Sequence, residues 1–367
     1  MCIMRETNQP IKLSILQAQK EFKLKEDDNG FIISGVTRDK KWDDLVIPQF
    51  IDDKPVHTIG DSAFSEHNIK NIHFPDTIRH IEEYACHDCK IEGTLVIPEG
   101  VISIGPKAFG RTNINSVQLP DSLQIIGSNA FEMNANLTKI TIPKGVIKIE
   151  GSLFGFCYAL KSVTVDRNNK IYDSREGCNA IIETSTNTLV CGCLATKVHK
   201  DIRILGKECF FNVPLSSINI PEGVLEIEDS ALSCDEYEVF GKKTAYQLNS
   251  VKLPSTLKKI GGYAFSGQGK LKKIEIPSGV SVIEDSSFAY TGLQSLVISE
   301  GVKVLGDYAF AGCEKLKRVV IPASVTSFGK NLFAYSAMKS NGAIIEVKPK
   351  SEALKFAKQK KLTIVEV

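Results

Sequence analysis

The sequence lacks the long hydrophobic runs that a membrane protein needs. No segment approaches the roughly 18 apolar residues of a membrane-spanning helix. The first 20 residues hold no apolar run long enough for the core of a signal peptide. We therefore expect a soluble chain without membrane insertion, and a route out of the cell is not visible in it.

Charge of one sign is also scarce. A formal net charge of +2 over 367 residues gives no field to attract nucleic acid and no polybasic signal for a membrane surface. The hydrophobic content of 43% and charged content of 24% are those of an ordinary soluble globular chain. No nucleic-acid partner is expected.

Signatures of catalysis are missing as well. There is no G-x-S-x-G elbow and no G-x-x-x-x-G-K-[ST] phosphate loop. Carboxylates recur at equivalent turn positions, where capping of a helical turn explains them better than acid–base chemistry: Glu82, Glu83, Asp229, Glu284 and Asp285. We expect no catalytic residue, no enzymatic activity and no cofactor.

What the chain does have is a repeat. One column, here called the proline column, recurs every 22 or 23 residues over most of the chain, with one early interval of 27 residues and two intervals of 33 residues. It is occupied by Pro48, Pro75, Pro98, Pro120, Pro143, Asp166, His199, Pro221, Pro254, Pro277, Ser299 and Pro322. Such a period is typical of a solenoid, which grows by stacking units and overrides the domain count suggested by length.

Each repeat resolves into short pieces. A strand such as Leu271–Ile276 places alternate residues inward, and the following proline ends it and starts a turn. Then come a second apolar pair, such as Val280 and Ile283, and about one helical turn carrying a small residue and an aromatic, such as Ala264-Phe265. The pattern predicts a β-rich solenoid, a right-handed α/β-type leucine-rich repeat superhelix with parallel strands, short helical turns and about 11–12 coils.

Two apolar columns keep strict register with the proline column, three residues after it and six residues before it. We expect both to be buried between stacked coils. A further column alternates between glycine, as at Gly105 and Gly306, and glutamate at Glu82, Glu150, Glu228 and Glu284. Glutamate is strained at positive φ, so this column is predicted to have negative φ and its glycines to serve close packing.

Both ends of the solenoid need a cover over their apolar edges. Residues 1–44 are predicted to be a loosely held lead-in followed by a β-hairpin around Asp27–Gly30, and 45–340 to be the solenoid. Residues 341–367 are predicted to form a C-terminal cap with a strand, a helix starting after Ser351 and a last strand. The whole is expected to be one continuous structural domain with insertions near 166–199 and 232–249.

The consensus L-x-x-I-x-I-P-x-x-V-x-x-I-G-x-x-A-F-x-x-C resembles the BspA-like class of leucine-rich repeats, over about residues 45–335. That class is known from bacterial surface proteins and some protists. The resemblance implies a leucine-rich-repeat solenoid that binds proteins or surfaces, with a cell-surface or secreted location. Since no signal peptide is visible, the cytoplasm stays open as the compartment.

The first long interval predicts a hairpin around Ser185-Thr186, with strands at Ala180–Thr184 and Asn187–Val190. Cys178 and Cys193 lie equally far from its centre, so facing positions could join them in a disulfide. The alternative is a pair of reduced thiols. Cysteines elsewhere fall on the repeat's packing columns and are expected to fill the core.

Histidines near the N-terminus and the Cys86-His87-Asp88-Cys89 run suggest zinc. Cys86 and Cys89 nevertheless occupy the Phe and Cys columns of the repeat, and the histidines belong to different columns, whereas a zinc site needs its ligands around one point. No metal site is expected.

The candidate binding residues come from two places. The second long interval adds aromatics that either form a binding loop or fold back to fill the solenoid. The outward row of the strands is flat and without aromatics. The candidates are Tyr237, Phe240, Tyr246, His73, Gln118, Lys252 and Glu275.

Two functions are compatible with these features. The first is a non-enzymatic protein-interaction or adhesion module, expected to be a monomer, whose partner is a protein or a host or extracellular-matrix surface. The second is an intracellular structural or scaffolding repeat protein. A Cys178–Cys193 bond would favour the first, and reduced thiols the second.

Overall fold

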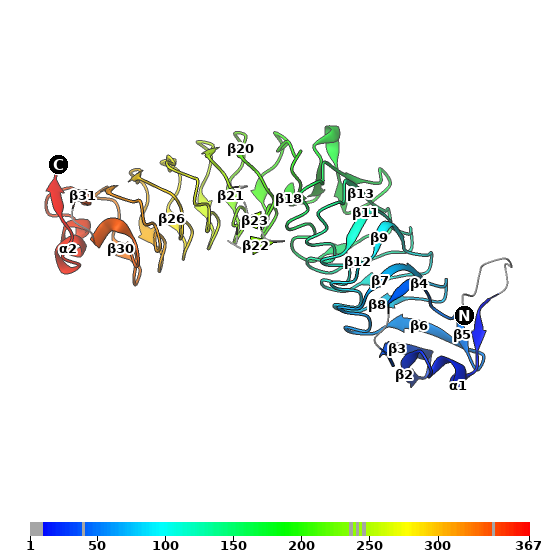
Figure 1. Ribbon diagram of the computed structural model, residues 1–367. Coiled ribbons are helices and arrows are strands. Elements are labelled where there is room, and N and C mark those ends of the chain that lie inside the picture. The colour runs from blue at the N-terminus through cyan, green and yellow to red at the C-terminus, as the bar shows by residue number, and fades with distance from the viewer. Residues whose placement is uncertain (1–9, 39–40, 235–237, 240–241, 244–246, 340–341) are drawn as a thin grey trace. The chain divides into compact units, whose positions relative to one another are not determined.

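The structure is a computed structural model that describes residues 10–38, 41–234, 238–239, 242–243, 247–339 and 342–367. The chain divides into two compact units, unit 1 up to Tyr172 and unit 2 from Asp173 onward. The division falls inside the first long interval of the repeat. Figure 1 shows both units as series of short strands that follow one another along the chain.

Unit 1 opens with a capping structure. Residues 12–18, expected as a loose lead-in, instead form β1 (Lys12–Leu13) and α1 (Ile15–Ala18). The predicted hairpin is confirmed as β2 (Phe22–Asp27) paired antiparallel with β3 (Gly30–Val36). β3 pairs parallel with β6 (Lys54–Ile59), and β5 (Phe50–Ile51) pairs with β1 and β6. The hairpin therefore covers the edge of the first coil.

The predicted strands before the proline column form the first ladder, in which neighbouring strands are parallel. In unit 1 it consists of β4 (Trp42–Val46) and β7 (Ile69–His73), and of β9 (Glu92–Val96), β11 (Asn113–Gln118), β13 (Lys139–Ile142) and β15 (Ser162–Val165). In unit 2 it consists of β20 (Ser217–Asn219) and β24 (Ser250–Lys252), and of β27 (Ser295–Val297), β29 (Arg318–Ile321), β31 (Ile344–Val347) and β32 (Ile364–Glu366).

A second parallel ladder runs through the apolar pair that follows the proline turn. In unit 1 it continues from β6 through β8 (His80–Ile81), β10 (Ser103–Ile104), β12 (Ile125–Ile126) and β14 (Lys148–Ile149). In unit 2 it comprises β19 (Ile204–Leu205), β21 (Glu226–Ile227), β25 (Lys259–Ile260), β26 (Val282–Ile283), β28 (Val304–Leu305) and β30 (Ser327–Phe328).

The remaining elements lie at the insertions and the C-terminus. They are β16 (Tyr172–Asp173), η1 (Arg175–Gly177), β17 (Ala180–Glu183), β18 (Thr188–Gly192), β22 (Glu238–Val239), β23 (Lys242–Lys243), η2 (Ala337–Lys339) and α2 (Glu352–Gln359). The solenoid of parallel strands is confirmed, and among the described residues helix is confined to α1, α2 and the short 3-10 segments η1 and η2.

The segment that the sequence predicts as one helical turn in each coil does not form a helix. Alternate residues there donate backbone hydrogen bonds to the next coil: Tyr263 to Asp285, Phe265 to Ser287 and Gly267 to Ala289. Residues two and six positions after the glycine column have left-handed backbones, as at Tyr263 and Tyr290, both with φ of 56°. We call this side of the coil the turn edge. It joins the coils as a third ladder, which a helix with internal hydrogen bonds could not do.

The predicted core columns are confirmed. Three positions after the proline column, every residue except the half-buried Asn169 is fully buried: Ile51, Ile78, Val101, Leu123, Val146, Ile202, Val224, Leu257, Val280, Val302 and Val325. The column six positions before it, which includes Leu137, Leu271 and Leu316, is buried too. Behind the turn edge the phenylalanines stack from coil to coil, with ring centroids 5.2 Å apart for Phe265 and Phe288 and 5.8 Å for Phe288 and Phe310.

The glycine column behaves as predicted. None of its four glutamates, Glu82, Glu150, Glu228 and Glu284, is among the residues of positive φ. A Cβ at Gly306 would lie 2.6 Å from the backbone nitrogen of Asp285 in the preceding coil. Close approach of backbones, and not a left-handed conformation, therefore requires glycine there.

The recurrent carboxylates cap backbone N–H groups of neighbouring coils. Glu228 accepts from the N–H of Lys207 at 2.9 Å, and Asp285 accepts from that of Asp307 at 2.7 Å. The predicted role as backbone caps holds, although the capped groups belong to the turn edge of an adjacent coil and not to a helix. These side chains are structural.

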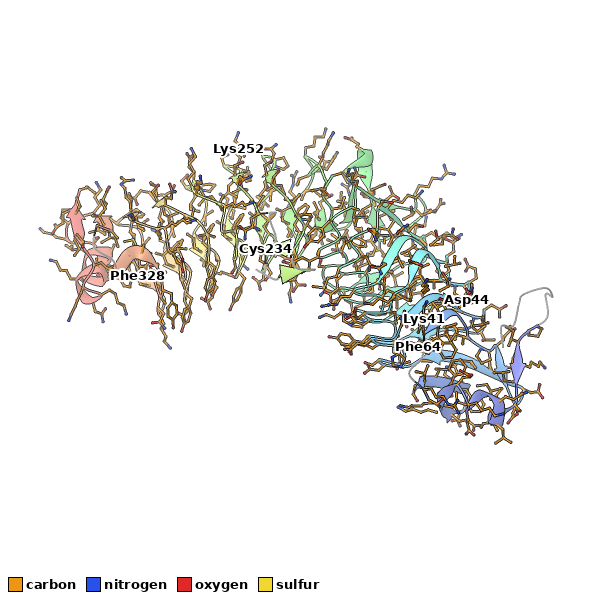
Figure 2. The ribbon with its side chains drawn as sticks, in the orientation of Figure 1. Lys41, Asp44, Phe64, Cys234, Lys252 and Phe328 are labelled. Carbon is orange, nitrogen blue, oxygen red and sulfur yellow. The ribbon has the colours of Figure 1, made fainter. Side chains whose placement is uncertain are left out.

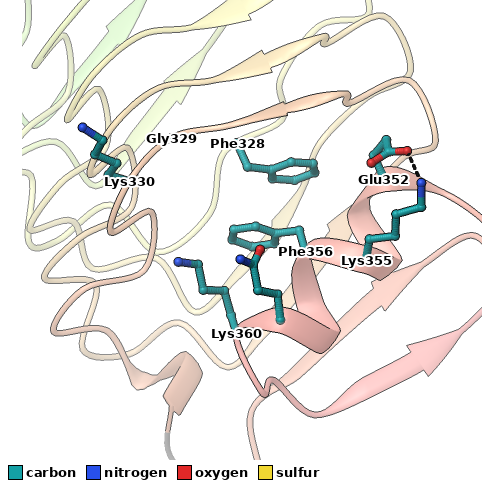
Figure 3. A pocket seen from close by; sticks show the side chains of 8 residues that line it. Phe328, Gly329, Lys330, Glu352, Lys355, Phe356 and Lys360 are labelled. Atoms are coloured by element: carbon teal, nitrogen blue, oxygen red, sulfur yellow. Dashed lines mark hydrogen bonds and ion pairs between the residues drawn. The ribbon is translucent and has the colours of Figure 1, made fainter.

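The C-terminal cap closes unit 2. The side chain of Ser351 accepts a hydrogen bond from the N–H of Leu354 and begins α2, as expected. Phe356 of α2 stacks on Phe328, with ring centroids 4.4 Å apart, and the two rings face each other in Figure 3. Lysines surround a hollow of about 300 Å³ here, and Lys355 is paired with Glu352 at 2.6 Å. α2 thus covers the last apolar coil.

Truncation of one side chain in a buried column should destabilise the protein strongly. Leu316→Ala removes a fully buried side chain between coils, so we expect a loss of about 2–5 kcal/mol in the free energy of unfolding by urea. Lys317→Ala, next to it and exposed, should change stability by less than about 0.5 kcal/mol. Equal effects of the two substitutions would contradict the stacked-coil core.

Candidate functional site

The outward row of the first ladder lies where the sequence places it. Val46 pairs with His73 in unit 1, and Val96 pairs with Gln118. In unit 2, Asn219 pairs with Lys252, while Glu275 bridges to Val297. Lys252 projects outward from the strand side of unit 2 (Figure 2). His73 and Gln118 are separated by β9, so the candidates form a row and do not converge on one point.

A hollow of about 340 Å³ interrupts this row in unit 1. It lies between β7 and β9, which belong to different sheets, and is lined by His73, Thr94 and Val96 among others. His73 Nε2 lies 3.3 Å from Asp44 Oδ1. Its lining residues include no Trp, Tyr or Arg, the usual hot-spot residues, and the ring of Phe74 is buried.

The hairpin in the first long interval is confirmed, and its register does not place Cys178 opposite Cys193. β17 and β18 pair Glu183 with Thr188, and an irregularity between Ile181 and Ile182 then shifts the register, so that Ala180 faces Gly192. The shift places Cys193 beside Asn179, whose carbonyl oxygen lies 3.5 Å from Cys193 Sγ. Both thiols are free and buried. Burial raises the pKa of Cys178 and of Cys193, which keeps them protonated and unreactive.

The Cys86-x-x-Cys89 pair behaves as packing. Both side chains are fully buried, and Cys89 Sγ lies 2.9 Å from the carbonyl oxygen of Phe64. His87 instead packs edge-to-face on Tyr84, with ring centroids 5.2 Å apart. Within the described residues no three His, Cys, Asp or Glu side chains gather where they could hold a metal ion.

Three candidates from the second long interval, Tyr237, Phe240 and Tyr246, lie outside the described residues. The residues that flank the segment are described. Cys234 donates its N–H to Ser266, and the Gln247 side chain donates to the carbonyl oxygen of Gly267 at 3.0 Å. Both ends of the insertion therefore join the turn edge at the coil of Gly267.

That turn edge carries a feature that the sequence reasoning missed. Four tyrosines of unit 2 are strongly exposed there: Tyr263 (54%), Tyr290 (60%), Tyr308 (41%) and Tyr335 (79%). They occupy successive coils and alternate between the two left-handed columns, so Tyr263 and Tyr308 share one column and Tyr290 and Tyr335 the other. The same columns in unit 1 hold mainly charged and polar residues, such as Lys107 and Arg111.

A groove of about 530 Å³ runs across the coils of Tyr263, Tyr290 and Gly312, and Tyr308 and Tyr335 lie outside its lining. Tyr263 and Tyr290 line it, with Ser266 and Thr291 beside them, and glycines occupy positions where side chains would fill it: Gly267, Gly269, Gly292 and Gly312. A Cβ at Gly312 would lie 2.3 Å from Cδ1 of Tyr290, so the glycine lets that ring lie flat over the next coil. The groove is thus aromatic, shallow and almost uncharged.

The backbone conformation of these four tyrosines is energetically unfavourable. Each has φ of 55° or 56°, a conformation that bulky residues adopt rarely and that asparagine or glycine adopts more readily. The signal was present in the sequence as tyrosines at fixed offsets from the glycine column, but a helical interpretation of that segment hid it.

No helix among the residues that the structure describes has the length and apolar character needed to cross a membrane.

The architecture defines the class of protein: a solenoid of parallel β-coils with leucine-rich repeats. A family model described as "BspA type Leucine rich repeat region (6 copies)" matches residues 56–179, 191–241 and 236–347. The chain belongs to this family. No curated protein matches it.

Solved structures agree with the fold. A leucine rich cell surface protein of Faecalibacterium prausnitzii A2-165 is 25% identical, with a TM-score of 0.53 over 85% of this chain and 93% of that chain. The pneumococcal vaccine antigen PcpA is 18% identical, with a TM-score of 0.63 over 95% of this chain and 99% of that chain. A leucine-rich repeat protein of Eubacterium ventriosum is 16% identical, with a TM-score of 0.53 over 82% and 80%.

The hairpin thiols should be protected in the native protein. Because Cys178 and Cys193 are buried with raised pKa values, we expect slow alkylation by N-ethylmaleimide at neutral pH and rapid alkylation after denaturation. Cys209, fully buried with its pKa raised well above the usual value by burial, serves as the matched control. Peptide mapping without reductant that recovers a Cys178–Cys193 linked peptide would contradict the observed register.

Proposed function

We propose that the chain is a non-enzymatic protein-interaction module, acting as a monomer, and that it binds its partner through the tyrosine-lined groove of unit 2. The single observation that carries this is the exposed tyrosine row over a glycine floor. Tyrosine is enriched among interface hot spots because its ring supplies a large contact area at low entropic cost.

The first ladder is less suited than the groove to tight binding of a partner. The outward rows of the first ladder present mainly polar and aliphatic side chains without exposed aromatics, which suits extended, weak contacts. His73, Gln118, Lys252 and Glu275 remain candidates for such secondary contacts. Cys234, which lines the groove, is the last described residue before the segment of the chain that holds the candidates Tyr237, Phe240 and Tyr246.

One version of the proposal places the site of action at the cell surface, in the manner of an adhesion protein. The named neighbour from Faecalibacterium prausnitzii, similar over most of both chains, supports this version. The free Cys178 and Cys193 favour the alternative, an intracellular scaffold. The proposal of protein binding through the groove is the same in either compartment.

A displayed-peptide selection tests the groove. Random peptides on phage are panned on the immobilised full chain, and enriched peptides are then titrated against Tyr263→Ser/Tyr290→Asn. We expect affinity to fall about tenfold or more, because both hot-spot rings are lost. Serine already occupies the column of Tyr263 at Ser62, Ser230 and Ser286, and asparagine that of Tyr290 at Asn212, so the coil should stay folded.

Tyr84→Ser is the matched control, since Tyr84 stands in the same left-handed column but in unit 1. It should leave the affinity of the selected peptides unchanged. Peptides that bind the double variant as well as wild type, or that lose affinity equally in Tyr84→Ser, would show that the groove is not the binding surface.

A further inference from the structure

We propose that the groove takes a proline-rich segment in the polyproline II conformation, lying along the direction in which the coils of unit 2 stack. This inference rests on the proposed function, because it names the class of partner for the same groove. Aromatic-lined grooves are the usual receptors for such segments, which are already extended and lose little entropy on binding.

The spacing of the tyrosines supports this occupant. Backbone hydrogen bonds join the turn edges directly, Tyr263 N–H to Asp285 and Tyr308 N–H to Lys330, so successive coils are about 5 Å apart. Tyr263 and Tyr308 share a column two coils apart, as do Tyr290 and Tyr335. Each pair is therefore separated by about 10 Å.

A polyproline II helix repeats its faces at nearly the same distance. It has three residues per turn and a rise of about 3.1 Å per residue, so equivalent side chains recur every 9 Å or so. A segment that lies in the groove along the stacking direction would present one face to Tyr263 and, where it leaves the groove a turn later, the same face to Tyr308. Tyr290 and Tyr335 would contact the neighbouring face in the same way.

The groove's chemistry fits an uncharged peptide. Apart from Glu314 and Lys315, which are of opposite sign and adjacent, its lining is tyrosine, glycine, serine, threonine and cysteine. Among its described lining residues Lys315 is the one cation and stands next to Glu314, whereas single-stranded nucleic acids would need a cationic surface for their phosphate groups in addition to stacking. Ring faces over a glycine floor suit the flat pyrrolidine rings of proline. Hydroxyl groups of Tyr263 and Ser266 can donate to the peptide's carbonyl oxygens, which polyproline II leaves free of internal hydrogen bonds.

Calorimetric titration with three probes tests the occupant. The probes are a capped decaproline, a capped glycine–serine decapeptide of equal length and chitohexaose as a linear carbohydrate. Decaproline is expected to bind the wild-type chain and Tyr84→Ser alike, and to bind Tyr263→Ser/Tyr290→Asn at least tenfold more weakly. The flexible glycine–serine peptide should give no measurable binding, and sequences from the phage selection should be enriched in proline at a spacing of three residues.

The possible failures are distinguishable. If selected peptides bind the groove but contain no enriched proline, and decaproline does not bind, the occupant is wrong while the proposed function stands. If chitohexaose binds and the double variant abolishes its binding, the groove is a carbohydrate site and the polyproline proposal is overturned. If no probe or selected peptide distinguishes the double variant from wild type, the proposed function and this inference fall together.

Discussion

Hydrogen bonding between successive coils within each unit is the constraint from which the rest of the structure follows. The second ladder and the turn edge place backbone N–H and carbonyl groups opposite those of the next coil, and the first ladder does so except where it is interrupted, as between β7 and β9. This holds hydrogen-bonded coils about 5 Å apart. Side chains must then meet their equivalents in the next coil, which explains the uniform burial of the aliphatic columns and the stacking of the phenylalanines.

The short distance between coils also explains why glycines, carboxylates and cysteines recur at fixed positions. Glycine recurs where a Cβ would collide with the preceding coil, as at Gly306. Carboxylates such as Glu228 satisfy N–H groups that the tight turn edge leaves without a backbone partner. Cysteines at packing columns serve as small apolar side chains, and burial raises the pKa of Cys86 and Cys313. The glycines, carboxylates and cysteines named here therefore serve the stacking of coils. Side chains that can bind a partner are those exposed at the edges of the coils.

The features of the fold that recur in every repeat could be predicted from the sequence. The proline column, the buried columns and the negative φ of Glu82 and its equivalents follow from spacing, because a strict period permits only stacking of equal units. The N-terminal hairpin and the C-terminal helix follow from local turn and capping signals. Two-residue strands such as β26 are too short to give a period of their own, so the second ladder was missed. The turn edge was misjudged because small and aromatic residues at these offsets also suit a helical turn. The irregularity in the β17–β18 hairpin, which separates Cys178 from Cys193, depends on local register that symmetry about a turn cannot reveal.

The exposed tyrosines can form one binding surface only if the stacking of coils keeps them aligned. The most direct test is a crystal structure of the full chain, in which the distance between the Cα atoms of Tyr263 and Tyr308 is measured. The account predicts about 10 Å, with both rings on the same side of the turn edge and one coil between them. A markedly longer distance, or rings that point to different sides of the coil, would contradict the stacked-coil account and remove the basis for a periodic binding groove.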